Sequence, residues 1–385
     1  WLMSTVVCTV ISTIIFGLRR EVAEAKSLGQ YTLVQKLGEG GMGTVYRARH
    51  AMMQRPTAIK VLGHGQATNS QIDRFEREVQ LTSRLTHPNT ITIFDYGRTD
   101  RGEFYYVMEL LDGATLDEIV AVGNAQSPER VVHVMSQVAA ALMEAHDSGL
   151  IHRDIKPSNV FLTSLGGKPD VAKLVDFGLV KELSHKDRTE LTGDATITGT
   201  PLYMPPEAIT SPKSVDERSD LYSLGALGYF LLTGEHVFDG ATAVEVCGHH
   251  LHSTPQPPAD RLGRHVPEDL EGLLLELLAK EPSERPSSAE QLLDRLSRCD
   301  SSGNWTDERA LEWWEEHEAA ILRLRGRPVP TRGLTVATAL AGAWAADAGG
   351  PVCRWDFDGS LAGRGSGRSR DGLVARDAGS ARNAG

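Results

Sequence analysis

The chain has 385 residues, of which 41% are hydrophobic and 24% are charged, the profile of a folded protein rather than a largely disordered one. Its 40 Lys and Arg against 51 Asp and Glu give a formal net charge of −11, which argues against a general nucleic-acid binder, because such proteins present a basic face. The four cysteines lie far apart and form no C-x-x-C pair, which excludes a disulfide scaffold and a cysteine-rich zinc site and fits a reducing compartment.

An uncharged, mostly apolar run at residues 1–18 opens the chain. Eighteen helical residues span about 27 Å, slightly less than the ~30 Å hydrocarbon core of a bilayer. Arg19 and Arg20 follow directly, as on the cytoplasmic side of a membrane span. We expect the last part of a transmembrane helix whose beginning is missing, then a juxtamembrane linker at 19–29 and a cytoplasmic domain. A signal-peptide remnant is the alternative, although no basic residue precedes the run.

A strand-like run, a G-x-G-x-x-G loop and a second strand-like run occupy residues 31–50. Gly38, Gly40 and Gly43 allow a tight turn whose backbone N–H groups approach phosphates with no side chain in the way. In dinucleotide-binding folds the same pattern runs into a helix. Here the β-prone residues 44–46 follow the loop, which favours a β-hairpin folded over a nucleotide.

Lys60 ends the next apolar run. A lysine at the end of a buried strand is costly unless it is paired. Residues 71–85 have the apolar spacing of a helix, and this helix carries the acidic partner that we expect for Lys60. We favour Glu78 for this role, with Glu76 as the competitor.

Two further motifs follow, H-R-D-I-K-P-S-N at 152–159 and D-F-G at 176–178. Together with the glycine loop before them, they make about residues 31–296 resemble the protein kinase family, in particular bacterial members of the eukaryotic type. Lys156, two positions after Asp154, resembles the Ser/Thr branch rather than the Tyr branch.

This resemblance implies a two-lobed α+β fold, with a small β-rich N-lobe that carries one helix and a large, mainly α-helical C-lobe. The implied segments are the kinase domain 30–298, its N-lobe 30–108, the hinge 109–113 and the C-lobe 114–298. Adenine would bind the hinge backbone at Glu109 and Leu111, with Met108 at the back of the pocket. The other implied ATP-binding residues are Leu37, Gly38, Gly40, Gly43, Val45, Ala58 and Lys60.

The resemblance also implies roles in phosphoryl transfer from MgATP, which is catalysed mainly by positioning and charge neutralisation. Asp154 would accept or orient the proton of a Ser or Thr hydroxyl, and Lys156 would neutralise charge on the transferred group. Asn159 and Asp176 would supply oxygen ligands to Mg²⁺, a hard cation, with Mn²⁺ as a possible substitute. Three residues complete the catalytic set: Lys60 on the α- and β-phosphates, Glu78 holding Lys60, and Thr200 touching the catalytic Asp and Lys.

The stretch 183–198 is polar and threonine-rich, which is typical of a mobile loop. Arg153, beside the catalytic Asp, resembles the marker of kinases that loop phosphorylation switches on, since a guanidinium can pair with a phosphate bidentately. By spacing, the expected phosphorylation sites are Thr192 first, then Thr196 and Thr198. Phosphorylation between two copies is the usual implication, so a homodimer is a candidate partner.

Five residues have structural roles by resemblance. Phe177, followed by Gly178, would pack between the helix of Glu78 and the catalytic loop. Glu207 should pair with Arg285, and Asp220 should bind the backbone of the catalytic loop.

Two segments follow the kinase-like region. Residues 304–326 have the spacing of an amphipathic helix, in which Trp313 or Trp314, His317, Ile321 and Leu324 share a face. We expect it to pack on the large lobe, and a docking or dimer helix is the alternative. The Gly-, Ala- and Arg-rich residues 327–385 predict a poorly ordered tail, or the start of a further domain that is cut short.

The function predicted from these features is a membrane-anchored Ser/Thr protein kinase, a transferase that uses ATP and Mg²⁺ in phosphorylation-based signalling. Its partners would be proteins bearing Ser or Thr, and not nucleic acid. A pseudokinase or nucleotide-binding scaffold is the main alternative, and a small-molecule kinase is the second.

Overall fold

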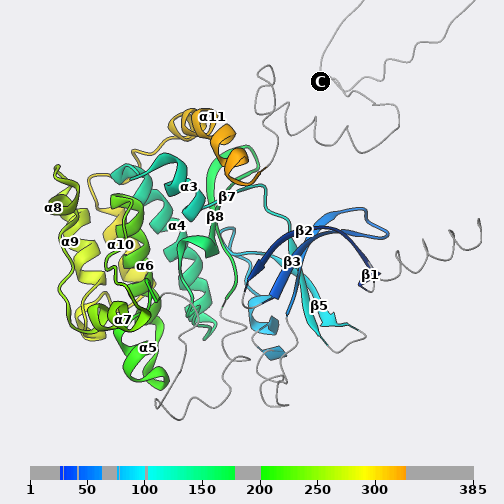
Figure 1. Cartoon of the computed structure of the whole chain (residues 1–385), viewed down its shortest axis with the longest axis horizontal. Helices are drawn as coiled ribbons and strands as arrows, with labels where there is room; N and C mark the ends of the chain where they lie inside the picture. The colour runs from blue at the N-terminus through cyan, green and yellow to red at the C-terminus, as the bar shows by residue number, and fades with distance from the viewer. Residues whose placement is uncertain are drawn as a thin grey trace, which may run out of the picture. The chain divides into compact units, whose positions relative to one another are not determined.

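The computed structural model describes two lobes joined by one short segment (Figure 1). The described residues are 27–28, 30–40, 43–62, 76–77, 79–99, 103–177 and 201–326. The apolar run 1–18 and the tail 327–385 lie outside these residues, so the expectations about an anchor and a tail are not tested. Within the described part, no helix is both long and apolar enough to cross a membrane.

The small lobe is built on an antiparallel sheet with the strand order β1-β2-β3-β4-β6-β5. Its strands are β1 (Ser27–Leu28), β2 (Tyr31–Gly40), β3 (Gly43–His50), β4 (Pro56–Val61), β5 (Ile93–Arg98) and β6 (Phe104–Glu109). β2 and β3 form the predicted hairpin, with Gly40 paired to Gly43. Gly43 has a φ of 143°, and a Cβ there would lie 2.3 Å from the Val61 carbonyl oxygen. Only glycine fits this turn.

β4 lies inside this sheet, and most of its residues are buried. Ala58 and Ile59 point to opposite faces of the sheet, and both are almost fully buried, as expected for a strand that is covered on both faces. Lys60 follows them and is only 6% exposed. The burial of β4 therefore carries a lysine into the space between the lobes.

The large lobe is mainly helical. Its elements are, in chain order, α3 (Leu116–Gly123), α4 (Pro128–Asp147), η1 (Pro157–Asn159), α5 (Pro206–Thr210), η2 (Pro212–Ser214), α6 (Glu217–Thr233), α7 (Ala243–His252), α8 (Pro258–Leu262), α9 (Glu268–Leu277), η3 (Pro282–Glu284), α10 (Ala289–Ser297) and α11 (Asp307–Leu324). α6 is buried continuously from Ser219 to Thr233, as its apolar sequence predicts. α4 packs on α6, α10 packs on α4 and α9 packs on α6, and their buried apolar residues form the core.

A second sheet, β7-β8-β9, lies in the large lobe next to the junction of the lobes. Its strands are β7 (Gly113–Thr115), β8 (Val160–Leu165) and β9 (Lys168–Leu174). Leu174 at the end of β9 forms a parallel bridge with Thr90, which lies just before β5. This bridge places the residues after β9 directly beneath the small lobe.

α11 packs on α3 and on β9, and Figure 1 shows it in orange beside α3. Thr306 caps its first turn by accepting a hydrogen bond from the Arg309 amide. Ala310 and Ile321 are buried on the packed face, but Leu324 is 56% exposed. Leu324 was predicted to lie on this face and does not. Arg325, one turn after Ile321, turns inward there instead.

Candidate active site

The backbone of the catalytic-loop motif is hydrogen-bonded to the Asp220 side chain. Its two carboxylate oxygens accept hydrogen bonds from the backbone amides of His152 and Arg153, both at 2.8 Å. His146 lies 2.8 Å from the same carboxylate. Arg153 has a φ of 62°, a left-handed conformation that a non-glycine residue adopts only where its surroundings impose it. Asp220, expected to bind this backbone, therefore fixes a strained turn just before Asp154.

Asp154 lies at the centre of a small polar cluster. The Asn159 side-chain amide donates to the Asp154 carboxylate at 3.0 Å and to its backbone carbonyl at 2.8 Å. The Lys156 ammonium lies 2.9 Å from the same carboxylate. The Asp154 side chain is 12% exposed and that of Lys156 is 37% exposed. The carboxylate is thus oriented by two partners and still reachable from solvent.

His152 packs beneath this cluster and is fully buried. Burial lowers its pKa, which favours the neutral imidazole, although nearby carboxylates such as Asp220 oppose this. Its Nε2 lies 3.1 Å from the Val175 carbonyl oxygen, and its ring lies against Phe177 with 4.6 Å between centroids. His152 and Phe177 therefore pack against each other beneath the polar cluster.

Asp176 receives two partners from the small lobe. The Lys60 ammonium lies 2.7 Å from one carboxylate oxygen, and the Tyr106 hydroxyl donates to the other at 2.7 Å. Asp176 has a φ of 57°, so its backbone is also left-handed. Burial raises the Tyr106 pKa well above its ordinary value, so this hydroxyl keeps its proton and can donate.

The donor set of Asn159 and Asp176 fits a hard divalent cation. Asn159 uses its amide nitrogen on Asp154, which leaves its carbonyl oxygen as the ligand atom. Asp176 contributes a carboxylate that is 28% exposed. Oxygen ligands of these two kinds are those that Mg²⁺ and Mn²⁺ accept in proteins.

The predicted hinge begins at the end of β6. Met108 is 9% exposed and belongs to the large core cluster, and its place at the back of an adenine pocket stays a prediction. The Glu109 amide donates to the Thr92 carbonyl at 3.0 Å, so this residue can offer adenine its carbonyl oxygen rather than its amide. The Glu109 carboxylate accepts from the Thr92 amide at 2.9 Å and from the Lys173 ammonium at 2.7 Å.

The residues predicted to cover the nucleotide lie along β2, β3 and β4. Leu37 is 38% exposed and Ala58 is buried. Val45 packs against the large core cluster. Among the described residues, no heavy atom lies within 4 Å of a Cβ built at Gly38, so β2 is open at this position.

The large lobe is braced by the predicted Glu207–Arg285 pair. The Arg285 guanidinium donates to both Glu207 oxygens, at 2.7 and 2.9 Å, and Ser219 donates to the first at 2.6 Å. Burial pushes the Glu207 pKa up, but these hydrogen bonds outweigh it and hold the pKa below its ordinary value. Such a pair is costly to break, because one charge would remain buried without its partner.

The sequence did not single out Tyr106 or Lys173. Lys173 is 3% exposed and joins the hinge to β9 through Glu109 and the Thr90 carbonyl. A lysine within the apolar run before D-F-G was the available signal, since a buried lysine needs a partner. Tyr106 carried no such signal, because a tyrosine in a strand is ordinary.

Several predicted residues lie outside the described part. They are the side chain of Glu78, and Gly178, Thr192, Thr196, Thr198 and Thr200. The competitor Glu76 is described, and it pairs with Arg98 at 2.9 Å rather than with Lys60.

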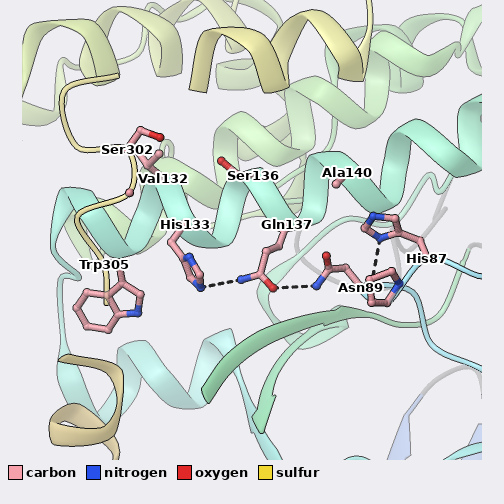
Figure 2. A pocket seen from close by; sticks show the side chains of 11 residues that line it. His87, Asn89, Val132, His133, Ser136, Gln137, Ala140, Ser302 and Trp305 are labelled. Atoms are coloured by element: carbon pink, nitrogen blue, oxygen red, sulfur yellow. Dashed lines mark hydrogen bonds between the residues drawn. The ribbon is translucent and has the colours of Figure 1, made fainter. Parts of the chain in front are cut away.

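A cavity of about 320 Å³ lies on α4, away from the catalytic motifs. Figure 2 shows a hydrogen-bonded row of His133, Gln137 and Asn89 along one side, with Trp305 at one end. Its lining contains no carboxylate, lysine or arginine. It could not neutralise a polyphosphate, so the polar cluster between the lobes is the better candidate active site.

Comparisons with known proteins agree with this assignment. Residues 31–296 match the family model of the protein kinase domain. The serine/threonine-protein kinase pkn3 of Myxococcus xanthus is 38% identical over 274 residues, 70% of this chain and 50% of that protein. PrkC of Bacillus subtilis is 35% identical over 265 residues, 69% of this chain and 39% of that protein.

The crystal structure of the Mycobacterium tuberculosis PknI kinase domain matches with a TM-score of 0.54 and 28% identity, covering 70% of this chain and 96% of that one. The chain thus spans half or less of the curated relatives named above. The predicted two-lobed fold is confirmed. The chain belongs to the protein kinase domain family, and its kinase domain is of the serine/threonine type, a transferase.

Proposed function

We propose that this chain transfers the γ-phosphoryl group of ATP, with Mg²⁺ as the metal, to Ser and Thr hydroxyls of protein substrates. One observation carries the proposal: two aspartates, of which Asp176 has a left-handed backbone, lie with their partners between the lobes. The residues concerned are Lys60, Asp154, Lys156, Asn159 and Asp176. Phosphoryl transfer needs positioned positive charge and an oriented carboxylate rather than a covalent catalyst.

The metal would be held by Asn159 and Asp176, and when bound it supplies positive charge that neutralises the phosphates. Lys60, in contact with Asp176, brings a second positive charge to the same space. Its burial beside Asp176 means that this ammonium has lost most of its water. It can therefore bind a phosphate oxygen more strongly than an exposed lysine could.

Asp154 would orient the attacking hydroxyl and receive its proton. Asn159 and Lys156 hold its carboxylate in place, so orientation costs little at the moment of reaction. The partly exposed Lys156 ammonium would neutralise charge on the group in transfer. We propose direct transfer from ATP to the hydroxyl, with no phospho-enzyme intermediate, because positioning and charge neutralisation are enough for this reaction.

The experiment is incubation of the full chain with MgATP, beside Asp154→Asn, followed by mass spectrometry of phosphosites. The proposal predicts phosphothreonine or phosphoserine in the unaltered chain alone. Phosphate on neither protein, together with a rise in melting temperature on adding ATP, would favour a nucleotide-binding scaffold instead. Transfer to a small molecule but to no protein would favour the small-molecule kinase.

We further propose that phosphorylation of Thr192, Thr196 or Thr198 activates the chain, with Arg153 as the phosphate partner and transfer between two copies. The support is the threonine-rich segment and the strained Arg153 backbone beside Asp154. Mixing an inactive Asp154→Asn chain with active chain tests this. Phosphate on the inactive copy is expected, and phosphate confined to the active copy would argue for transfer within one molecule.

We also propose that residues 1–18 anchor the chain in a membrane, with the kinase domain in the cytoplasm. The support is the uncharged run followed by Arg19 and Arg20. Carbonate extraction of cell membranes tests it. The full chain should remain with the membrane, and removal of 1–18 should release it. A chain that is extracted with or without 1–18 would contradict the anchor.

A further inference from the structure

α11 lies beyond residues 31–296 that match the kinase family model. We propose that it is part of the nucleotide-binding machinery, and that Arg325 is a positioning residue that fixes the far end of the hinge. The inference rests on the proposed function only in taking 109–113 as the segment that binds adenine.

One end of α11 is fixed to a buried ion pair. Arg130 donates to both oxygens of Asp170, at 2.8 and 3.0 Å, and both residues are at most 2% exposed. The indole N–H groups of Trp305 and Trp314 donate to the same carboxylate, at 2.9 and 2.6 Å. The Arg130 guanidinium also lies 3.9 Å from the ring centroid of Trp313. If α11 and the residues before it moved away, the buried Asp170 carboxylate would lose the two hydrogen bonds from Trp305 and Trp314.

The other end of α11 reaches the hinge. The Arg325 guanidinium donates to the Gly113 carbonyl oxygen at 2.8 Å and makes two hydrogen bonds with the Glu118 carboxylate. Both side chains are about one-fifth exposed. Burial raises the Glu118 pKa, but the bonds from Arg325 and Thr115 outweigh this and lower it, so the carboxylate stays charged.

The two partners of Arg325 bracket the start of the large lobe. Gly113 ends the predicted hinge, and its backbone lies so close to β8 that a Cβ would sit 2.0 Å from the Leu162 carbonyl oxygen. Glu118 closes the capping box of α3 with Thr115. One guanidinium therefore ties together the strand that follows the hinge and the first turn of α3.

This first turn is also linked to the catalytic loop. α3 packs on η1, which contains Asn159. Asp117, next to Glu118, has its pKa raised by burial and lowered in part by the charge of Lys156. A shift of residues 113–118 would therefore displace the hinge backbone directly, and would act on Lys156 only through Asp117. Misplacements of about 1 Å can cost an enzyme up to ~100-fold.

The test is a titration of the full chain with MgADP, together with kinetics in ATP. Arg325→Ala should weaken MgADP binding about tenfold and raise the KM for ATP by a similar factor, while kcat and the KM for a protein substrate change less than about twofold. Arg323→Ala, on the exposed face of the same helix end, is the matched control and should change nothing. Arg325→Lys should restore part of the affinity, because an ammonium can still bond the Gly113 carbonyl.

If Arg325→Ala fails to fold, Glu118→Gln carries the test, since a glutamine oxygen still completes the capping box but removes the ion pair. It should weaken MgADP binding by a smaller factor than Arg325→Ala. Unchanged MgADP affinity in both variants would overturn the inference, as would an equal loss in Arg323→Ala. Binding of MgADP by the unaltered chain without phosphate transfer would refute the proposed function alone, and no MgADP binding at all would refute both.

Discussion

Two aspartates six residues apart, Asp170 and Asp176, share an unusual backbone conformation but differ in the exposure and the partners of their side chains. Both have a left-handed backbone, with φ of 51° and 57°. Asp170 is 1% exposed and accepts four hydrogen bonds, from the Arg130 guanidinium and from Trp305 and Trp314. Asp176 has a side chain that is 28% exposed, and its described partners come from the small lobe.

The difference shows what makes a carboxylate available for chemistry. Two carboxylate oxygens offer about four acceptor sites, and at Asp170 rigid donors of the large lobe fill them. At Asp176 the partners are Lys60 and Tyr106, and Lys60 can exchange its carboxylate for a phosphate. Strain alone does not distinguish the two positions, whereas exposure and the count of acceptor sites in use do.

The largest effect should come from Asp176→Asn. It removes the negative charge that would bind the metal and breaks the ion pair between Asp176 and the buried Lys60. We expect phosphate transfer to fall about 10³-fold with the fold retained, measured as initial rate against Mg²⁺ concentration. Asp147→Asn, at an exposed position, serves as the control. Transfer within tenfold of the unaltered chain would remove the distinction drawn between the two aspartates.

Asp170→Asn should act on stability instead. It leaves the Arg130 guanidinium buried without a countercharge, so we expect the free energy of unfolding to fall by about 3–5 kcal/mol. Urea unfolding measures this, and the transfer rate per folded molecule should stay within a few-fold. A large loss of rate with no loss of stability would mean that Asp170 also serves the reaction.

Acid pH should destabilise the fold through a buried histidine, His250. Burial, helped by the charge of Lys280, lowers its pKa to about 4, against about 6.5 when unfolded. Stability from the neutral imidazole is therefore complete above pH 6.5 and is lost as pH falls toward 4, by about 3 kcal/mol. Urea unfolding at several pH values should show a shallower loss in His250→Asn than in the exposed control His265→Asn. Equal slopes would contradict this.

The smallest effect is expected from Trp314→Phe, which removes one indole donor to Asp170 but keeps most of the packing. We expect a loss of about 1–3 kcal/mol in unfolding free energy, because one acceptor site of a buried carboxylate becomes empty. Glu315→Gln, its exposed neighbour, should change stability by less than about 0.5 kcal/mol. If both substitutions cost the same, the acceptor sites at Asp170 are not what holds α11.

The family resemblance that the short motifs carry was enough to predict the two-lobed fold and to name much of the candidate site. The glycine loop, Lys60, the catalytic-loop motif and D-F-G each require particular residue types at fixed spacing, and of these Lys60 meets Asp176 between the lobes. The pairs Glu207–Arg285 and Asp220 with the catalytic-loop backbone span 78 and 68 residues, and they could be predicted because the family resemblance implied them.

Contacts between distant segments that belong to no motif could not be predicted from the sequence. Lys173 and Glu109 are 64 residues apart, and Trp314 is 144 residues from Asp170. The sequence around one residue of such a pair does not identify the other residue, because these contacts depend on how whole helices and strands pack. The helical spacing of its apolar residues predicted α11. The inward position of Arg325 could not be predicted, since an arginine at the end of a helix is ordinary.

The bonds of Glu109 have a mechanical consequence. Its amide and its carboxylate are both tied to Thr92, and the carboxylate is tied again to Lys173 of β9. The last residue of the small-lobe sheet therefore cannot act as a flexing joint. Beyond Gly113 the chain is held by β8 and Arg325. The Asp112 carbonyl also accepts from the Thr163 hydroxyl of β8. Rotation of one lobe against the other must therefore be absorbed at residues 110 and 111, so the pivot is two residues long.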